Sequence, residues 1–194
     1  MPETDGMIRA FEAAAEILNA AGFIDLSGDA LTEGLKKRLF GIGVNSEDRA
    51  YEMLRLTQIV DSEVFWRVFH HCWSSCDDTW ALNRALLQSL SFHNAEDPAR
   101  NYMDRKQAKF YKALPDIVTV FRGCSKDRVL GISWTTDVAV AEEFARGHRG
   151  MSPPNRVVAR ARIPRSEIFT VVVHREESEI VLNPSELIDL KSLN

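Results

Sequence analysis

The sequence predicts an α+β protein in which a helical N-terminal lobe packs on a β-rich C-terminal lobe. Apolar residues recur at helical spacing through the first 113 residues, whereas β-branched segments bounded by proline and glycine dominate after Pro115. The length of 194 residues and the hydrophobic content of 45% suffice for a sizeable core. We therefore expect a helical lobe at 1–114 and a β-rich lobe at 115–194, which could together form one compact domain.

Several helices are expected in the first lobe. Apolar residues recur at helical spacing over 8–18, and Gly22 is a suitable stop. The polar run 45–48 is typical of a helix start, because its side chains can accept hydrogen bonds from free backbone N–H groups. A helical, aromatic-rich pattern covers 61–90, and a further helix is expected over 102–114.

The segment 61–90 carries two side-chain clusters that could bind a ligand. One comprises Trp66, Trp73 and Trp80, which recur every seven residues and so predict one stripe of a helix. A stripe facing the core is the preferred interpretation, and an aromatic wall for a target or for adenine is the alternative. The other cluster comprises His70, His71, Cys72 and Cys76. Structural zinc needs four ligands and no second cluster exists elsewhere, so no metal is expected.

The second lobe reads as short strands. The segment 117–121 is β-branched and lies between a proline and a glycine. The segment 157–163 alternates, with Val157, Ala159, Ala161 and Ile163 on one face and Val158, Arg160 and Arg162 on the other. Further strands are expected at 168–173, 179–182 and 187–190, and a short helix at 137–145.

Charge and cysteine usage limit the compartment and the partners. The net charge is −4, no apolar run is long enough to span a bilayer, and the N-terminus lacks the apolar core of a signal peptide. Three cysteines are too few, and odd in number, for a disulfide framework. We therefore expect a cytoplasmic protein without a membrane partner.

One basic segment stands out from this acidic composition. Residues 146–165 contain six arginines and no acidic residue. Guanidinium groups bind phosphate in bidentate fashion, so the segment suits a phosphate-bearing ligand. A solvated strand face explains the same residues equally well.

Three short motifs follow one another in the second lobe, each at the edge of a strand-like segment. They are Val120-Phe121-Arg122-Gly123, then Gly131-Ile132-Ser133-Trp134-Thr135-Thr136-Asp137, then Glu177-Ser178-Glu179. In this order they resemble the arginine, Ser-Thr-Ser and Glu-x-Glu signature of the cholera-toxin-like branch of mono-ADP-ribosyltransferases. The resemblance covers about 116–190 and implies an ADP-ribosyltransferase-like fold for the β-rich lobe. The hydroxyl motif departs from the family pattern, since it reads Ser-Trp-Thr-Thr.

The resemblance implies how NAD would be held. Arg122 would bind a phosphate oxygen of NAD, and Gly123 would allow close backbone approach. The hydroxyl groups of Ser133, Thr135 and Thr136 would orient the nicotinamide ribose. Strand alternation places Ser133 and Thr135 on one face and Thr136 on the other, which makes the first two the preferred pair.

The two glutamates would carry the chemistry. By resemblance, Glu179 would hydrogen-bond the ribose 2′-hydroxyl and stabilise the cation that develops as nicotinamide leaves. Glu177 would position or deprotonate the incoming acceptor. Residues two apart in an extended segment point the same way, so both carboxylates can face one cleft.

Two neighbours of these motifs are expected to be structural. Alternation points Trp134 away from Ser133 and Thr135, so we expect it in the core rather than stacked on nicotinamide or adenine. Cys124 is assigned to packing, because no histidine is tied to it by a known motif.

The resemblance therefore implies an NAD-dependent mono-ADP-ribosyltransferase, an enzyme with NAD as substrate and no metal. Its acceptor would be a macromolecule of unknown type, with protein preferred over nucleic acid. The compact build suits an intracellular bacterial or phage-type toxin or effector, for which a neutralising antitoxin or immunity protein is a compatible partner. The alternatives are an NAD glycohydrolase and a non-catalytic module that binds NAD, ADP-ribose or nucleic acid through 146–165.

Overall fold

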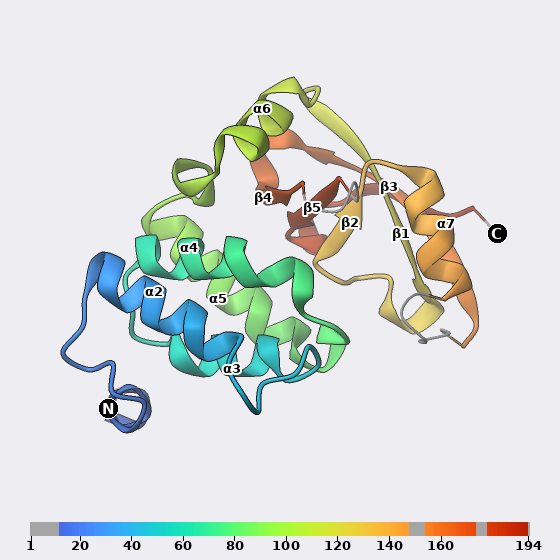
Figure 1. The fold of residues 1–194 in the computed structure, drawn as a ribbon. Helices are drawn as coiled ribbons and strands as arrows, with labels where there is room; N and C mark the ends of the chain where they lie inside the picture. Colours follow the sequence, from blue (N-terminus) through green and yellow to red (C-terminus); the bar gives the residue numbers. More distant parts are fainter. Residues whose placement is uncertain (1–11, 148–153, 174–177, 194) are drawn as a thin grey trace, which may run out of the picture. The chain divides into compact units, whose positions relative to one another are not determined.

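The computed structural model describes residues 12–147, 154–173 and 178–193. In these ranges the protein combines helices with a six-stranded antiparallel sheet (Figure 1), which confirms the mixed helix and sheet class. The chain divides into two units, Met1–Asp97 and Pro98–Asn194. Helix α6 (Arg105–Ala113), which precedes the first strand, therefore lies in the same unit as the sheet, whereas the sequence groups it with the helical lobe 1–114. Among the described helices, none has the length and apolar character needed to cross a membrane.

The first unit is helical. Residues 12–20 are helical and are followed by Gly22 at φ +75°. The later helices are α2 (Gly28–Leu39), α3 (Arg49–Leu56), α4 (Ser62–Cys72) and α5 (Asn83–Glu96). Asn45 Oδ1 accepts hydrogen bonds from the N–H groups of Glu47 and Asp48, both at 2.9 Å, so the predicted start at 45–48 leads into α3.

The helical segment 61–90 is interrupted, and the predicted tryptophan stripe is therefore wrong. After α4 the chain forms two 3-10 turns, Trp73–Ser75 and Thr79–Leu82, before α5 begins. Asp78 lies between them in the left-handed region at φ 42°, which breaks helical continuity. Trp66, Trp73 and Trp80 consequently lie on three different elements. Trp66 is nonetheless fully buried, and its Nε1 donates to the carbonyl oxygen of Asp97 at 2.9 Å.

The second unit is built on the sheet, whose strand order is β4-β5-β2-β1-β3-β6. The strands are β1 (Ile117–Ser125), β2 (Ser133–Thr135), β3 (Arg156–Pro164), β4 (Ile168–Val172), β5 (Glu179–Leu182) and β6 (Ile188–Ser192). These bounds confirm the strands predicted from alternation and from β-branched residues. The predicted short helix is α7 (Val138–Arg146), which begins with Asp137 Oδ1 accepting from the N–H of Ala139 at 2.8 Å.

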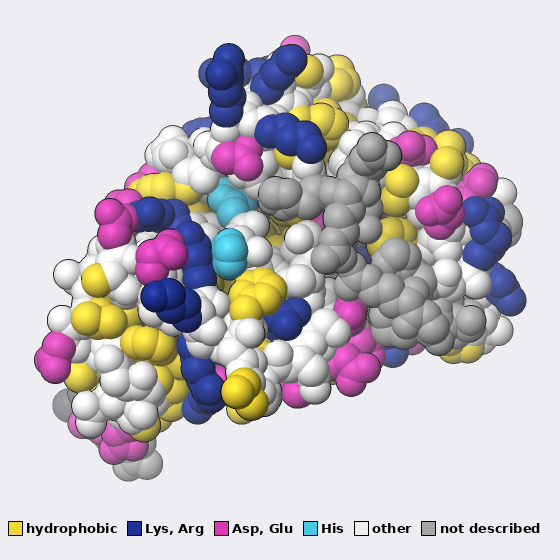
Figure 2. Space-filling view, in the orientation of Figure 1, with side chains coloured by type: hydrophobic (Ala, Val, Ile, Leu, Met, Phe, Trp, Pro, Cys, Tyr) yellow, Lys and Arg dark blue, Asp and Glu magenta, His cyan; other side chains and the backbone are white. Residues whose placement is uncertain are grey.

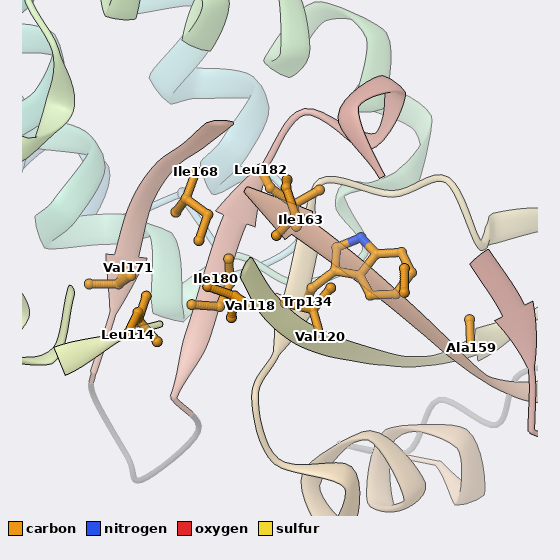
Figure 3. Packing of buried hydrophobic residues seen from close by; sticks show 11 residues of the cluster. Leu114, Val118, Val120, Trp134, Ala159, Ile163, Ile168, Val171, Ile180 and Leu182 are labelled. Atoms are coloured by element: carbon orange, nitrogen blue, oxygen red, sulfur yellow. The ribbon is translucent and has the colours of Figure 1, made fainter. Parts of the chain in front are cut away.

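One face of the sheet carries the apolar core of this unit (Figure 3). Its buried members are Leu114, Val118, Val120, Trp134, Ala159, Ala161, Ile163, Ile168, Val171, Ile180 and Leu182. Phe110 and Tyr111 of helix α6 (Arg105–Ala113) pack against this core. The Gln107 side chain anchors α6 by donating from Nε2 to the carbonyl oxygen of Val171 at 3.0 Å.

The opposite face carries α7. Phe121 and Val158 pack there against Ala141 and Ala145 of the helix. Val158 lies on this face while its neighbours Ala159, Ala161 and Ile163 lie in the core, as the predicted alternation of 157–163 requires. We call this side of the sheet the α7 face.

Candidate active site

The hydroxyl motif and the second glutamate of the Glu-x-Glu motif meet on adjacent strands. In the antiparallel pair of β2 and β5, Thr135 lies opposite Glu179 and Ser133 lies opposite Val181. Directly opposed residues project to the same side of a sheet, so Ser133, Thr135 and Glu179 share the α7 face. The Ser133 hydroxyl donates to Oε1 of Glu179 at 2.5 Å, across 46 positions of sequence. This contact joins two of the three motifs directly.

Arg122 supports the same arrangement through the backbone. Its Nη1 donates to the carbonyl oxygen of Ser133 at 2.5 Å and its Nε donates to that of Arg128 at 3.1 Å. The guanidinium lies against Gly131, where an added Cβ would be 2.4 Å from Nη2. The arginine expected to hold a phosphate therefore holds the backbone that leads into β2.

The electrostatics of Arg122 reflect this enclosed position. Burial lowers the pKa of its guanidinium, while the neighbouring Cys124 and Glu179 act to raise it. Arginine remains protonated in proteins, so the side chain places a poorly hydrated cation near Glu179.

Gly123 is required by the helix above it. A Cβ at this position would lie 1.7 Å from the carbonyl oxygen of Ala141 and 2.6 Å from the nitrogen of Ala145. The close backbone approach expected at Gly123 is thus the approach of α7. The sequence offers a signal for it in hindsight, since Ala141 and Ala145 are small residues one helical turn apart.

The other two hydroxyl residues have backbone partners. Thr135 is buried, and its Oγ1 accepts from the N–H of Asp137 at 3.1 Å, at the start of α7. The N–H of Thr136 donates to the carbonyl oxygen of Ser178 at 3.4 Å and extends the pairing of β2 with β5. The Ser133 hydroxyl, by contrast, donates to a side chain, the carboxylate of Glu179. Glu177, expected beside it, lies outside the described residues.

Trp134 and Cys124 are both buried, which is consistent with the packing roles expected for them. Trp134 is 2% exposed and its Nε1 donates to the carbonyl oxygen of Gly131 at 2.8 Å. The same residue, Gly131, thus accommodates Arg122 and anchors Trp134, a double role that the sequence pattern did not reveal. Burial raises the pKa of the Cys124 thiol although Arg122 acts to lower it, which makes this thiol a weak nucleophile at neutral pH.

In the described part of the arginine-rich segment, three arginines have acidic partners. Arg165 bonds to Asp116 at 2.9 Å, Arg162 pairs with Asp189 of β6, and the exposed Arg146 lies 3.8 Å from Glu142. Exposed basic side chains gather instead over α6, at the top of Figure 2, where the helix carries Arg105, Lys106, Lys109 and Lys112. The pairings of Arg146, Arg162 and Arg165 engage three of the arginines through which the alternative, a module that binds NAD, ADP-ribose or nucleic acid, would act.

The described ranges contain no group of three or more His, Cys, Asp or Glu side chains that could hold a metal ion.

No protein-family model matches the chain, and neither a curated protein nor a solved structure is significantly similar to it.

Proposed function

We propose that this protein is an NAD-dependent mono-ADP-ribosyltransferase that cleaves the nicotinamide–ribose bond and transfers ADP-ribose to a macromolecular acceptor. The observation that carries the proposal is the hydrogen bond from the Ser133 hydroxyl to Glu179 Oε1 at 2.5 Å, with Arg122 bonded to the carbonyl oxygen of Ser133. Residues of three motifs that are dispersed in the sequence are thereby joined by hydrogen bonds, one between side chains and one through the backbone of Ser133.

The proposed reaction begins with scission of the bond between the ribose C1′ and the nicotinamide nitrogen. The bonding electron pair leaves with nicotinamide, so positive charge develops on C1′ and the ring oxygen. The Glu179 carboxylate stabilises that charge. Ser133 holds the carboxylate in place by donating one hydrogen bond to Oε1, and we assign the contact with the ribose 2′-hydroxyl to the same carboxylate.

The second half of the reaction needs an acceptor. A nucleophile attacks C1′ as its proton passes to a base, and we assign this role to Glu177, two residues before Glu179 in the chain. We propose a protein acceptor in the cell, consistent with a toxin or effector.

The strand arrangement supports an ADP-ribosyltransferase-like architecture for the second unit. The arginine, hydroxyl and glutamate motifs lie on β1, β2 and β5, which are consecutive strands at the centre of the sheet. A site assembled from neighbouring central strands is held more rigidly than one assembled from loops.

Release of free nicotinamide from NAD tests the cleavage step. Glu179→Gln should reduce the rate at least about a hundredfold, because the substitution keeps the shape of the side chain and removes its charge. Glu186→Gln is the matched control, since Glu186 is an exposed glutamate of the same unit. Absence of nicotinamide release by the wild-type protein, alone and with lysate, would contradict the proposal.

A comparison of transfer with hydrolysis tests the role of Glu177. Glu177→Gln should lower incorporation of labelled ADP-ribose into lysate macromolecules much more than it lowers nicotinamide release, since water needs less activation and positioning than another acceptor. Mass spectrometry of the labelled products would identify the acceptor. Equal losses in both activities, or nicotinamide release without any labelled acceptor, would favour an NAD glycohydrolase.

A further inference from the structure

Arg160 lies on the same face of the sheet as Glu179. Thr135 is opposite Glu179 across β2 and β5, and it is also opposite Phe121 across β2 and β1. Phe121 is in turn opposite Arg160 across β1 and β3. Directly opposed residues share a face, so these four side chains form one row on the α7 face.

The spacing of this row suits a dinucleotide. Adjacent strands are about 4.8 Å apart, which places Cα of Arg160 about 14 Å from Cα of Glu179, with both long side chains able to shorten the gap. In NAD the pyrophosphate is separated from the scissile bond by one ribose. The side chain that binds the pyrophosphate must therefore lie at a distance from the catalytic carboxylate, as Arg160 does.

The row ends in a second cation. Lys191 of β6 is opposite Arg160 and is exposed. Among the described residues no hydrogen bond or ion pair engages the side chain of Arg160 or of Lys191, whereas the side chain of Arg162, two residues further along β3, is paired with Asp189. A guanidinium and an ammonium side by side form a suitable place for two linked phosphates.

Arg122 is less well placed for this role. It lies opposite Ala159, a member of the buried core, and therefore starts from the other face of the sheet. Its Nε and Nη1 are engaged by the carbonyl oxygens of Arg128 and Ser133.

We propose that Arg160, assisted by Lys191, binds the pyrophosphate of NAD, while Arg122 acts as a positioning residue for Ser133. This inference rests on the proposed cleavage of NAD. It assigns the phosphate contact to a residue outside the three motifs, and the strand register selects Arg160 from the arginine-rich segment 146–165.

Two substrates separate a phosphate contact from a general effect on the site. With NAD, Arg160→Gln should raise KM about tenfold to a hundredfold with little change in kcat, the effect of losing a charged hydrogen bond. With nicotinamide riboside, which has the same scissile bond and no phosphate, the variant should match the wild type. Arg160→Lys should retain part of the affinity for NAD.

Arg156→Gln is the matched control, because Arg156 is an exposed arginine on the same strand and the same side of the sheet. It lies four residues, or about 13 Å, further along β3. An unchanged KM for NAD in Arg160→Gln would overturn the inference while leaving the proposed function intact. Equal losses with both substrates would also overturn it.

Calorimetry with ADP-ribose provides an independent readout. Arg160→Gln should weaken its binding about tenfold or more, and Arg156→Gln should not. If wild-type protein released no nicotinamide but bound ADP-ribose through Arg160, the proposed function would fail and the phosphate site would stand. If Arg160→Gln bound ADP-ribose as tightly as the wild type, the phosphate site would fail.

Discussion

The Ser133 hydroxyl donates to Glu179 Oε1 at 2.5 Å, while the carbonyl oxygen of the same serine accepts from Arg122. Ser133 is therefore bonded on two sides, through its side chain to the carboxylate and through its backbone to the guanidinium. A displacement of either partner would be transmitted to the other through this one residue.

Replacement of Ser133 by alanine should lower kcat for nicotinamide release about tenfold to a hundredfold, because the carboxylate loses a charge-assisted hydrogen bond that orients it. KM for NAD should change much less. Ser166→Ala is the control, since Ser166 also donates to a glutamate, Glu167, at 3.1 Å, but both residues are exposed. Steady-state kinetics in which both variants match the wild type would contradict a catalytic role for the Ser133–Glu179 pair.

Arg122→Lys should destabilise the second unit by about 1–3 kcal/mol, because an ammonium cannot reproduce two bonds from one planar fork and leaves a partly buried carbonyl oxygen without this donor. Urea unfolding measures this change, and kcat should fall with it as Ser133 loses its support. A raised KM for NAD with unchanged stability would instead favour the direct phosphate contact predicted from the sequence. Arg156→Lys, on the exposed end of β3, is the control.

Gly123→Ala should destabilise the protein by about 1–3 kcal/mol or more, because its Cβ would lie 1.7 Å from the carbonyl oxygen of Ala141 and force α7 away from β1. The displacement reaches the site through Thr135, whose Oγ1 accepts from the N–H of Asp137 where α7 begins. Thermal melting and nicotinamide release should therefore decline together. A variant as stable as the wild type would show that α7 can move without cost.

The protein should lose stability as the pH falls below about 6.5, in part through His93. Burial lowers the pKa of this histidine from 6.5 to about 4, although Glu96 and Asp61 act to raise it. The unfolded state therefore binds the proton first as the pH falls. The stabilisation is fully present above 6.5, declines through the window down to about 4, and amounts to about 2 kcal/mol lost by pH 5.

Urea unfolding at pH 7.5 and pH 5.0 measures this loss. In His93→Gln the decrease between the two pH values should be about 2 kcal/mol smaller than in the wild type. The exposed His71 provides the control, and His71→Gln should retain the wild-type decrease. Equal decreases in wild type and His93→Gln would show that His93 titrates near its ordinary pKa in the folded protein.

Local patterns predicted the elements of the second unit well, because alternation of apolar and polar residues along a strand indicates which side chains face the core. In β3, Arg160 and Arg162 alternate with Ala159 and Ala161, which lie in the core, and the strand ends at Pro164. The order of the strands in the sheet, in contrast, could not be predicted from local patterns. Nothing local indicates that the three-residue strand β2 lies between β1 and β5, since the partners of Thr135 come from both sides along the chain.

The role of Arg122 illustrates a second limit. Its partners are carbonyl oxygens, and every residue carries one, so no side-chain pattern could identify Arg128 and Ser133 as acceptors. The interruption after α4 was equally hidden. Trp73 and Trp80 fit a helical period, but the left-handed Asp78 between them depends on tertiary context.

The brevity of β2 has a consequence for motion. Its pairing with β1 is limited to Phe121 opposite Thr135. The six-stranded sheet is therefore narrow at β2, which joins strands β4 and β5 to strands β1, β3 and β6. Glu179 lies on β5, on one side of this narrow part of the sheet, and Arg160 lies on β3, on the other side. A ligand that contacts both Glu179 and Arg160 would stabilise the pairing of β2 with its neighbours. The amide hydrogens of Ser133 to Thr135 should then exchange with deuterium more slowly.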